Sequence, residues 1–100
     1  MELKNGHLII PAALFQDVLQ GEPQINMVYY PERSQLLVAA KSKAFFEKLH
    51  QPVWMMLKDK NLAGDKALYV RELLIDHDLD AADRALPYSV KETGIIAISL

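Results

Sequence analysis

The feature that most constrains the fold is an apparent internal repeat with an offset of sixty residues. When the sequence is moved by sixty positions against itself, Leu8 meets Leu68 and Val38 meets Ile98. Both halves also follow one predicted order of strand, turn, strand, short helix, connector and hairpin. Because a unit of about fifty residues is too small to bury a core alone, the repeat predicts two related units in one pseudo-symmetric domain.

The first half opens with the signals for a hairpin and a helix. Two short strands are expected on either side of Asn5-Gly6, since these residue types tolerate the positive φ angles of a type I′ turn. A helix is expected over 11–21, because Pro is favoured in a first turn and Gly just past a helix end.

The first half continues with a second hairpin and a second helix. Residues 25–30 and 35–40 have the composition of strands and flank a turn, PERS. A helix is expected over 41–51, with Ser42 as its cap and Pro52 beyond its end. The side chains expected on its buried face are Phe45, Phe46 and Leu49.

The second half begins again with a strand, over 53–58, followed by a polar turn and the strand-like run ALYV. Residues 71–76 either extend that strand or open a helix, and residues 78–84 are either a helix start or a turn. The last two apolar runs flank KETG, so a hairpin is expected at the end of the sequence.

Composition restricts the class of protein. A chain of 100 residues with 51% hydrophobic and 24% charged residues is expected to form one globular domain. There is no Cys, which excludes disulfides and is typical of a reducing cytoplasm. The first residues lack the features of a secretory signal, and no apolar run reaches the roughly 18 residues of a membrane span. A cytoplasmic protein with no membrane partner is therefore expected.

The charge is distributed unevenly. The formal net charge is −2, which argues against a general nucleic-acid coat. Residues 41–60, however, carry five basic and two acidic groups, a net charge of +3, between two negative segments. An anionic partner is therefore expected to bind this middle segment, if the chain has one.

The order of elements and two stretches of sequence resemble the swapped-hairpin transcription regulators of the AbrB type. GHLIIPAALFQDVLQ is similar to their strand, Pro and short helix, and DLDAADRALPYSVKETGIIAIS to their connector and final hairpin. Two units in one chain, with the helix KSKAFFEKLHQ after the first hairpin, resemble the MraZ family in particular. The resemblance implies an α+β fold of two tandem swapped-hairpin units with two or three short helices. The units are 1–50, including the helix after the first hairpin, and 53–100, within a single domain over 1–100.

The resemblance also implies a non-enzymatic regulator that binds duplex DNA through the turns 4–7 and 58–66. Lysines on such loops can neutralise phosphates. The family's Asp-x-x-x-Arg motif is not retained, because Leu3 and His7 stand at its two ends. With three Arg in the whole chain, weak sequence readout is expected, since Lys cannot contact bases bidentately. The candidate DNA-binding residues are Lys4, Asn5, His7, Lys58, Lys60 and Lys66.

An alternative function is a protein–protein interaction module that keeps this fold and has lost DNA binding. The acidic balance and the missing Arg favour it, and Tyr30 and Trp54 are the candidate partner contacts. The run around Trp54 is also typical of a buried central strand. In this type of family, units assemble by exchanging hairpins, and exposed strand edges favour a partner. A homo-oligomer is therefore expected.

The acidic stretch Asp76–Asp83 is the remaining candidate for chemistry. The EF-hand template fails there, because Ala81 stands where Gly is needed and Pro87 where the bidentate Glu should be. Helix capping by Asp78 or Asp80 explains the stretch better, so no metal or other cofactor is expected. The sequence also lacks a nucleophile motif and a Gly-rich phosphate loop, so an enzyme is not expected.

Overall fold

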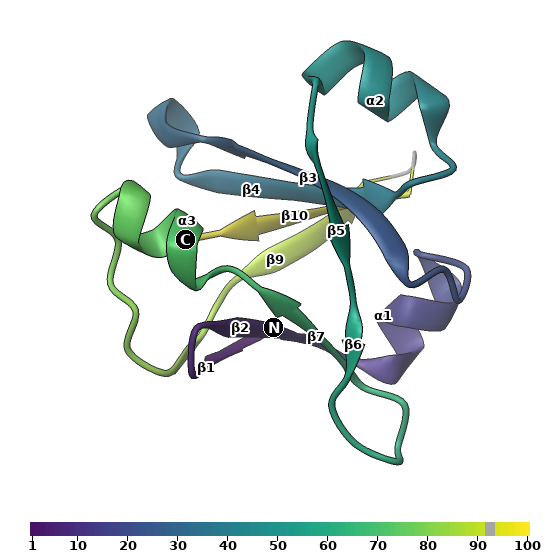
Figure 1. Cartoon of the computed structure of the whole chain (residues 1–100), viewed down its shortest axis with the longest axis horizontal. Coiled ribbons are helices and arrows are strands. Elements are labelled where there is room, and N and C mark those ends of the chain that lie inside the picture. The colour runs from purple at the N-terminus through teal and green to yellow at the C-terminus, as the bar shows by residue number, and fades with distance from the viewer. Residues whose placement is uncertain (92–93) are drawn as a thin grey trace.

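In the computed structural model, which describes residues 1–91 and 94–100, the chain forms ten strands and three α-helices. The strands make two antiparallel five-stranded sheets (Figure 1), which confirms a mixed α+β fold. Sheet A contains, in spatial order, β6 (Lys58–Asp59), β7 (Lys66–Tyr69), β2 (His7–Ile10), β1 (Glu2–Lys4) and β8 (Arg84–Ala85). Sheet B contains β5 (Val53–Met56), β3 (Gln24–Tyr30), β4 (Gln35–Ala40), β10 (Ile95–Ser99) and β9 (Tyr88–Lys91). The helices are α1 (Ala12–Asp17), α2 (Ala44–His50) and α3 (Arg71–Asp76).

Besides α1, which lies between β2 and β3, two bent segments connect the sheets. The chain passes from β5 at the edge of sheet B into β6 at the edge of sheet A, with the bend at Leu57. It passes back from β8 to β9 around Leu86. The N–H of Leu57 donates to the carbonyl of Pro23 (2.8 Å), and the N–H of Leu86 donates to that of Met1 (2.7 Å). The two sheets are therefore joined at both sides, and the strand predicted over 53–58 is divided in two.

The offset of sixty residues reappears in the strand register. At the centre of sheet A, Leu8 of β2 faces Leu68 of β7. At the centre of sheet B, Leu37 of β4 faces Ala97 of β10. In both sheets, strands of the second half flank a pair of strands from the first half. The two halves are thus interleaved in both sheets.

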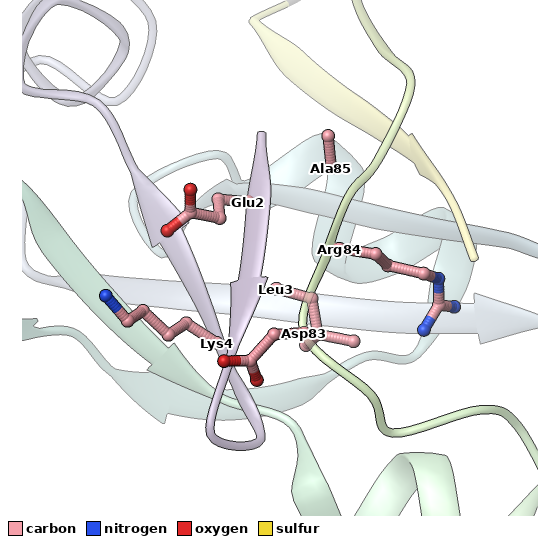
Figure 2. A pocket seen from close by; sticks show the side chains of 6 residues that line it. All are labelled: Glu2, Leu3, Lys4, Asp83, Arg84 and Ala85. Atoms are coloured by element: carbon pink, nitrogen blue, oxygen red, sulfur yellow. The ribbon is translucent and has the colours of Figure 1, made fainter.

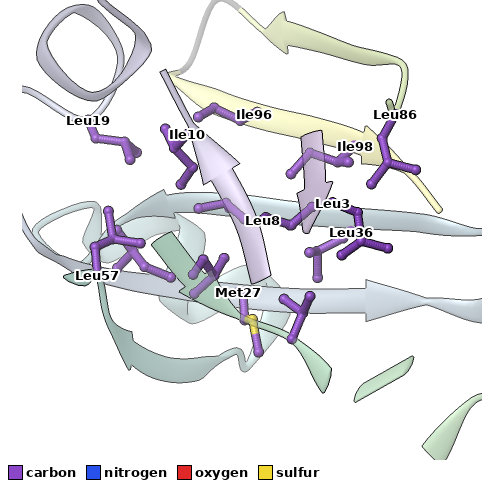
Figure 3. Close-up of a cluster of buried hydrophobic side chains, with 14 of the residues drawn as sticks. Leu3, Leu8, Ile10, Leu19, Met27, Leu36, Leu57, Leu86, Ile96 and Ile98 are labelled. Atoms are coloured by element: carbon purple, nitrogen blue, oxygen red, sulfur yellow. The ribbon is translucent and has the colours of Figure 1, made fainter. Parts of the chain in front are cut away.

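The core lies between the two sheets, where apolar side chains from both inner faces meet (Figure 3). Alternation along each strand supplies them, as with Leu8 and Ile10 from β2 and Ile96 and Ile98 from β10. The accessible surface is 5857 Å², close to the roughly 5,700 Å² expected for a folded monomer of this size. One copy of the chain therefore buries as much surface as a typical monomer.

The helix α1 is shorter than the predicted helix over 11–21. It follows Pro11 and ends at Asp17, because Gln20 and Gly21 have φ angles of 56° and 70°, in the left-handed region. Its Phe15 is buried in the core. Residues 71–76, for which a strand extension and a helix were both considered, form the helix α3, in which Leu74 is buried.

The helix α2 covers part of the outer face of sheet B, and most of its predicted contacts were wrong. Phe46 is buried against the sheet, but Phe45 and Leu49 are 74% and 62% exposed. Phe46 lies on the one side of the short helix that contacts the sheet, whereas Phe45 and Leu49 lie outside this contact. Ser42 does not cap the helix; its hydroxyl donates to Oε2 of Glu22 (2.8 Å) instead.

The strand β5 is not a buried central strand, as its apolar sequence had predicted. It lies at the edge of sheet B and pairs with β3. Val53, Trp54 and Met56 are exposed, and Met55 is the side chain that packs against the core. At the other edge, β9 and β10 form the predicted hairpin strands, with Lys91 facing Ile95. Residues 92–93 of its KETG turn lie outside the described residues.

The three helices lie around the two sheets (Figure 1). In Figure 1, α2 lies at the top of the molecule, and α1 and α3 lie at its two sides. Within residues 1–91 and 94–100, none of the helices has the length and apolar character that spanning a bilayer requires.

Candidate nucleic-acid interface

The first predicted contact loop is a two-residue turn between β1 and β2. Lys4 and His7 face each other across it, and Asn5 and Gly6 have φ angles of 50° and 74°. Positive φ at both central residues is the property of a type I′ turn, so the predicted hairpin is confirmed. The carbonyl of Gly6 accepts a hydrogen bond from the N–H of Val70 (2.9 Å). The turn is thereby attached to the chain just before α3.

Arg71, the first residue of α3, packs on this turn and was missed in the sequence. A Cβ atom built on Gly6 would lie 2.8 Å from both Cβ and Nε of Arg71. The contact arises because β2 and β7 pair antiparallel, which brings the residues after β7 to the turn before β2. The match of Leu8 with Leu68 was the sequence signal that could have placed Arg71 there.

The second predicted contact loop was 58–66; its ends belong to β6 and β7, and the connection between them, residues 60–65, is held against α1. Oδ1 of Asn61 accepts hydrogen bonds from the N–H groups of Ala63 (3.1 Å) and Asp65 (3.3 Å). Oδ1 of Asp65 accepts one from the N–H of Ala12, at the start of α1 (2.9 Å). The side chain of Asn61 and the N–H of Ala12 lower the pKa of Asp65, because both donate to its charged form. The carboxylate of Asp65 therefore holds the loop in place through hydrogen bonds within the chain.

The two loops meet at one shallow hollow on the outer face of sheet A. Lys4, Asn5 and His7 line it from the first turn, and Asp59 and Lys60 line it where β6 ends. The hollow has a volume of about 330 Å³. The structure thus brings together residues from both predicted contact loops.

The three lysines predicted on the second loop have different surroundings. Lys58 and Lys60 are exposed to solvent. Lys66 has a side chain that is only 18% exposed, and its Nζ donates to Oδ1 of Asp59 (2.5 Å). The same ammonium lies 4.8 Å from the ring centre of Phe15. Lys66 therefore stabilises the fold, whereas Lys58 and Lys60 are available to a ligand.

Aromatic side chains lie beside these lysines on the outer face of sheet A. Tyr69 of β7 is 39% exposed and faces His7 of β2, with the two ring centres 5.2 Å apart. Nδ1 of His7 donates to the carbonyl of Asn5 (2.9 Å), which fixes the orientation of the imidazole. The face therefore presents a pair of oriented rings next to basic side chains.

A second hollow lies where β1 meets β8 (Figure 2). Oδ1 of Asp83 accepts a hydrogen bond from the N–H of Asn5 (2.9 Å), which ties the first turn to the connector. Figure 2 shows Lys4 and Arg84 pointing in opposite directions from this place. Nη1 of Arg84 donates to the carbonyl of Asp80, so this arginine contacts its own connector. The side chains around the hollow are Glu2, Leu3, Lys4, Asp83, Arg84 and Ala85.

The acidic stretch 76–83 contains no helix start, so the predicted helix caps were wrong. Asp78 has a φ angle of 57°, and Oδ1 of Asp80 accepts the N–H of Ala82 (2.9 Å), which closes a local turn. His77 packs against Tyr29, with ring centres 4.6 Å apart. Among the residues that the structure describes, no three His, Cys, Asp or Glu side chains are grouped as a metal site would need.

The two predicted partner contacts have different environments. Tyr30 is half-buried beside α2; its hydroxyl is hydrogen-bonded to Nδ1 of His50 (2.5 Å), and Arg33 lies 4.8 Å from its ring centre. Trp54 is 51% exposed on β5, next to Asn26 of β3. Tyr30 therefore helps to hold α2 on sheet B, and Trp54 is the more accessible of the two.

The geometry of this face is the basis for a functional assignment, because similarity to known proteins supplies none. Comparison of the chain with protein-family models, with curated proteins and with solved structures found no match. The resemblance to the AbrB and MraZ regulators accordingly stays a prediction.

Proposed function

We propose that this chain is a non-enzymatic regulator that binds nucleic acid through the outer face of sheet A. The observation that carries the proposal is the hollow in which Lys4 and His7 of one loop meet Lys60 of the other. Lys58 and Arg71 extend the basic surroundings on either side, since Lys58 belongs to β6 and Arg71 packs on the first turn. Several cations around one hollow suit a phosphate backbone.

The architecture supports the swapped-hairpin part of the proposal. In both sheets, strands of the second half flank a pair of strands from the first half, and residues sixty positions apart face each other at both centres. Two units that exchange strands within one chain have this arrangement. We propose on this basis that the chain consists of two MraZ-like units, and that the two loops occupy equivalent places in them.

The proposal predicts binding that depends strongly on salt. If Lys4, Lys58 and Lys60 each neutralise one phosphate, the slope of log K against log salt concentration is about −2.7 for a duplex and about −2.1 for a single strand, because bound counterions are released. Replacing Lys4 and Lys60 together by Ala should flatten that slope by about 1.8 for a duplex or about 1.4 for a single strand. Fluorescence anisotropy of a labelled oligonucleotide, titrated at several salt concentrations, measures both quantities.

A matched control for this experiment is Lys48→Ala. Lys48 is an exposed lysine on α2, on the outer side of the other sheet. Its loss changes the net charge without changing the proposed face, so the slope should stay as in the wild type. No binding at low salt, or equal flattening of the slope by the Lys48 variant and the Lys4/Lys60 double variant, would reject nucleic-acid binding at this face.

A second function, a protein–protein interaction module, is favoured by the exposed apolar side chains of β5. Val53, Trp54 and Met56 are exposed on an edge strand that carries no charge. Natural proteins usually protect such edges with charged residues or Pro. A protein partner whose binding is lost in Trp54→Ser but kept in Lys4→Ala would favour this function over the first.

A further inference from the structure

We infer that the ligand of this face is an unpaired nucleic-acid strand, with bases stacked on Tyr69 and His7. The inference rests on the proposed function and names the form of nucleic acid that the face accepts. A single strand exposes the π faces of its bases, whereas base pairs in a duplex cover those faces with their neighbours. Exposed aromatic rings on a sheet beside a basic border are suited to the first form.

The arrangement of side chains across sheet A carries the inference. The strand register places outward-facing residues in two rows. One row runs through Lys58, Ala67, Ile9 and Glu2. The next row runs through Tyr69, His7 and Lys4. The rings therefore stand between lysines of β6 and β1, and the two rows are roughly 7 Å apart along the strands.

The same geometry disfavours a duplex. Reading a duplex requires an element that enters a groove, which in the major groove is about 12 Å wide. The first turn has two central residues, and both are tied down, Asn5 by Asp83 and Gly6 by Val70. The loop 60–65 is likewise held to α1. Both loops are therefore fixed by hydrogen bonds to the rest of the chain, and neither is free to adjust to a groove.

The acidic side chains of this face determine how a bound strand is oriented on it. Asp59 lines the hollow, but its carboxylate accepts a hydrogen bond from Lys66 and is thereby partly neutralised. Glu2 lies at the β1 end of the other row and repels a phosphate there. The backbone of a bound strand should therefore pass near Lys60 and Lys4, with its bases turned toward Tyr69.

The test compares a labelled single-stranded DNA of about 12 nucleotides with its matched duplex. The wild-type chain should bind the single strand more tightly than the duplex. Tyr69→Ala should weaken single-strand binding by about 5- to 150-fold, whereas Tyr69→Phe should retain it, because the ring remains. Tyr88→Ala removes an exposed tyrosine from β9 of sheet B and should leave binding unchanged.

The outcomes separate this inference from the proposed function. Equal or tighter binding of the duplex, or unchanged binding by Tyr69→Ala, overturns the single-strand inference. Binding that still depends on Lys4 and Lys60 would then leave the proposed function standing. No binding of either form at low salt rejects both.

A second variant keeps the test decisive if Tyr69→Ala fails to fold. Tyr69→Trp in a Trp54→Phe background leaves one indole in the chain, placed on the proposed face. Stacking of a base on that indole should quench its fluorescence as the single strand is added. Binding measured by anisotropy without such quenching would contradict stacking at this position.

Discussion

At the scale of single residues, Gly6 determines whether the first turn and α3 can meet. Its φ angle is 74°, and a Cβ atom there would lie 2.8 Å from two atoms of Arg71. Gly6→Ala should therefore lower the free energy of unfolding by about 1–2 kcal/mol from the left-handed backbone, with a further cost from the overlap. Urea unfolding at neutral pH measures the loss.

A double-mutant cycle measures the part of the cost that comes from overlap with the long side chain of Arg71. In an Arg71→Ala background the overlap with the long side chain is reduced, so Gly6→Ala should cost less than in the wild type. An equal cost in both backgrounds would show that the atoms of Arg71 beyond its Cβ contribute nothing to the cost. An unchanged unfolding midpoint in Gly6→Ala would contradict the strained turn altogether.

The residue scale also shows what a local sequence pattern can and cannot reveal. Asn5 and Gly6 were predicted correctly, because a type I′ turn depends on the two residues themselves. Arg71 was missed, because its place beside the turn depends on the pairing of β2 with β7. Residues that act through distant pairing have no local signature.

At the scale of elements, Asp65 connects the loop 60–65 to the start of α1. Its pKa is lowered from 3.8, first by the side chain of Asn61 and then by the N–H of Ala12. A depressed pKa in the folded state adds stability above the unfolded pKa, and this is lost as the pH falls through the folded pKa. The connection should therefore weaken in acid.

Asp65→Asn tests this connection while keeping the shape of the side chain. The variant should be less stable than the wild type at neutral pH, and the difference should shrink as the pH falls below about 3.8. Urea unfolding at a series of pH values measures the difference. Glu32→Gln, at an exposed carboxylate in the β3–β4 turn, is the control. A difference that is constant with pH would mean that the charge of Asp65 contributes nothing.

The elements differ in how far the sequence predicted them. The strands β3 and β4 and the turn between them were predicted, since alternation and turn residues are local. The exposure of Trp54 and Phe45 was not predicted, because an apolar run does not show whether other elements of the fold will cover it. The same limit applies to the candidate site: its loops and His7 were named from the sequence, whereas Tyr69, which faces His7 from β7, was not.

At the scale of the whole molecule, the interleaved halves should depend on each other for folding. Each sheet needs strands from both halves, so fragments 1–51 and 52–100 should each be unfolded alone. Mixed together, they should regain the circular dichroism and near-ultraviolet spectra of the intact chain. A folded, monomeric fragment on its own would contradict the interleaved arrangement.

The bent segment between β8 and β9 has a consequence for how the chain reaches its fold. Leu3 of β1 pairs with Arg84, and the carbonyl of Met1 accepts the N–H of Leu86. During synthesis, β1 therefore cannot pair with its second neighbour, β8, until most of the chain has been made. Contacts of such long sequence separation slow folding, and the waiting strand is exposed to aggregation. The strand β1 is short, and Glu2 and Lys4 flank its single apolar residue, Leu3. Both properties disfavour pairing with other chains while one edge of β1 is unpaired.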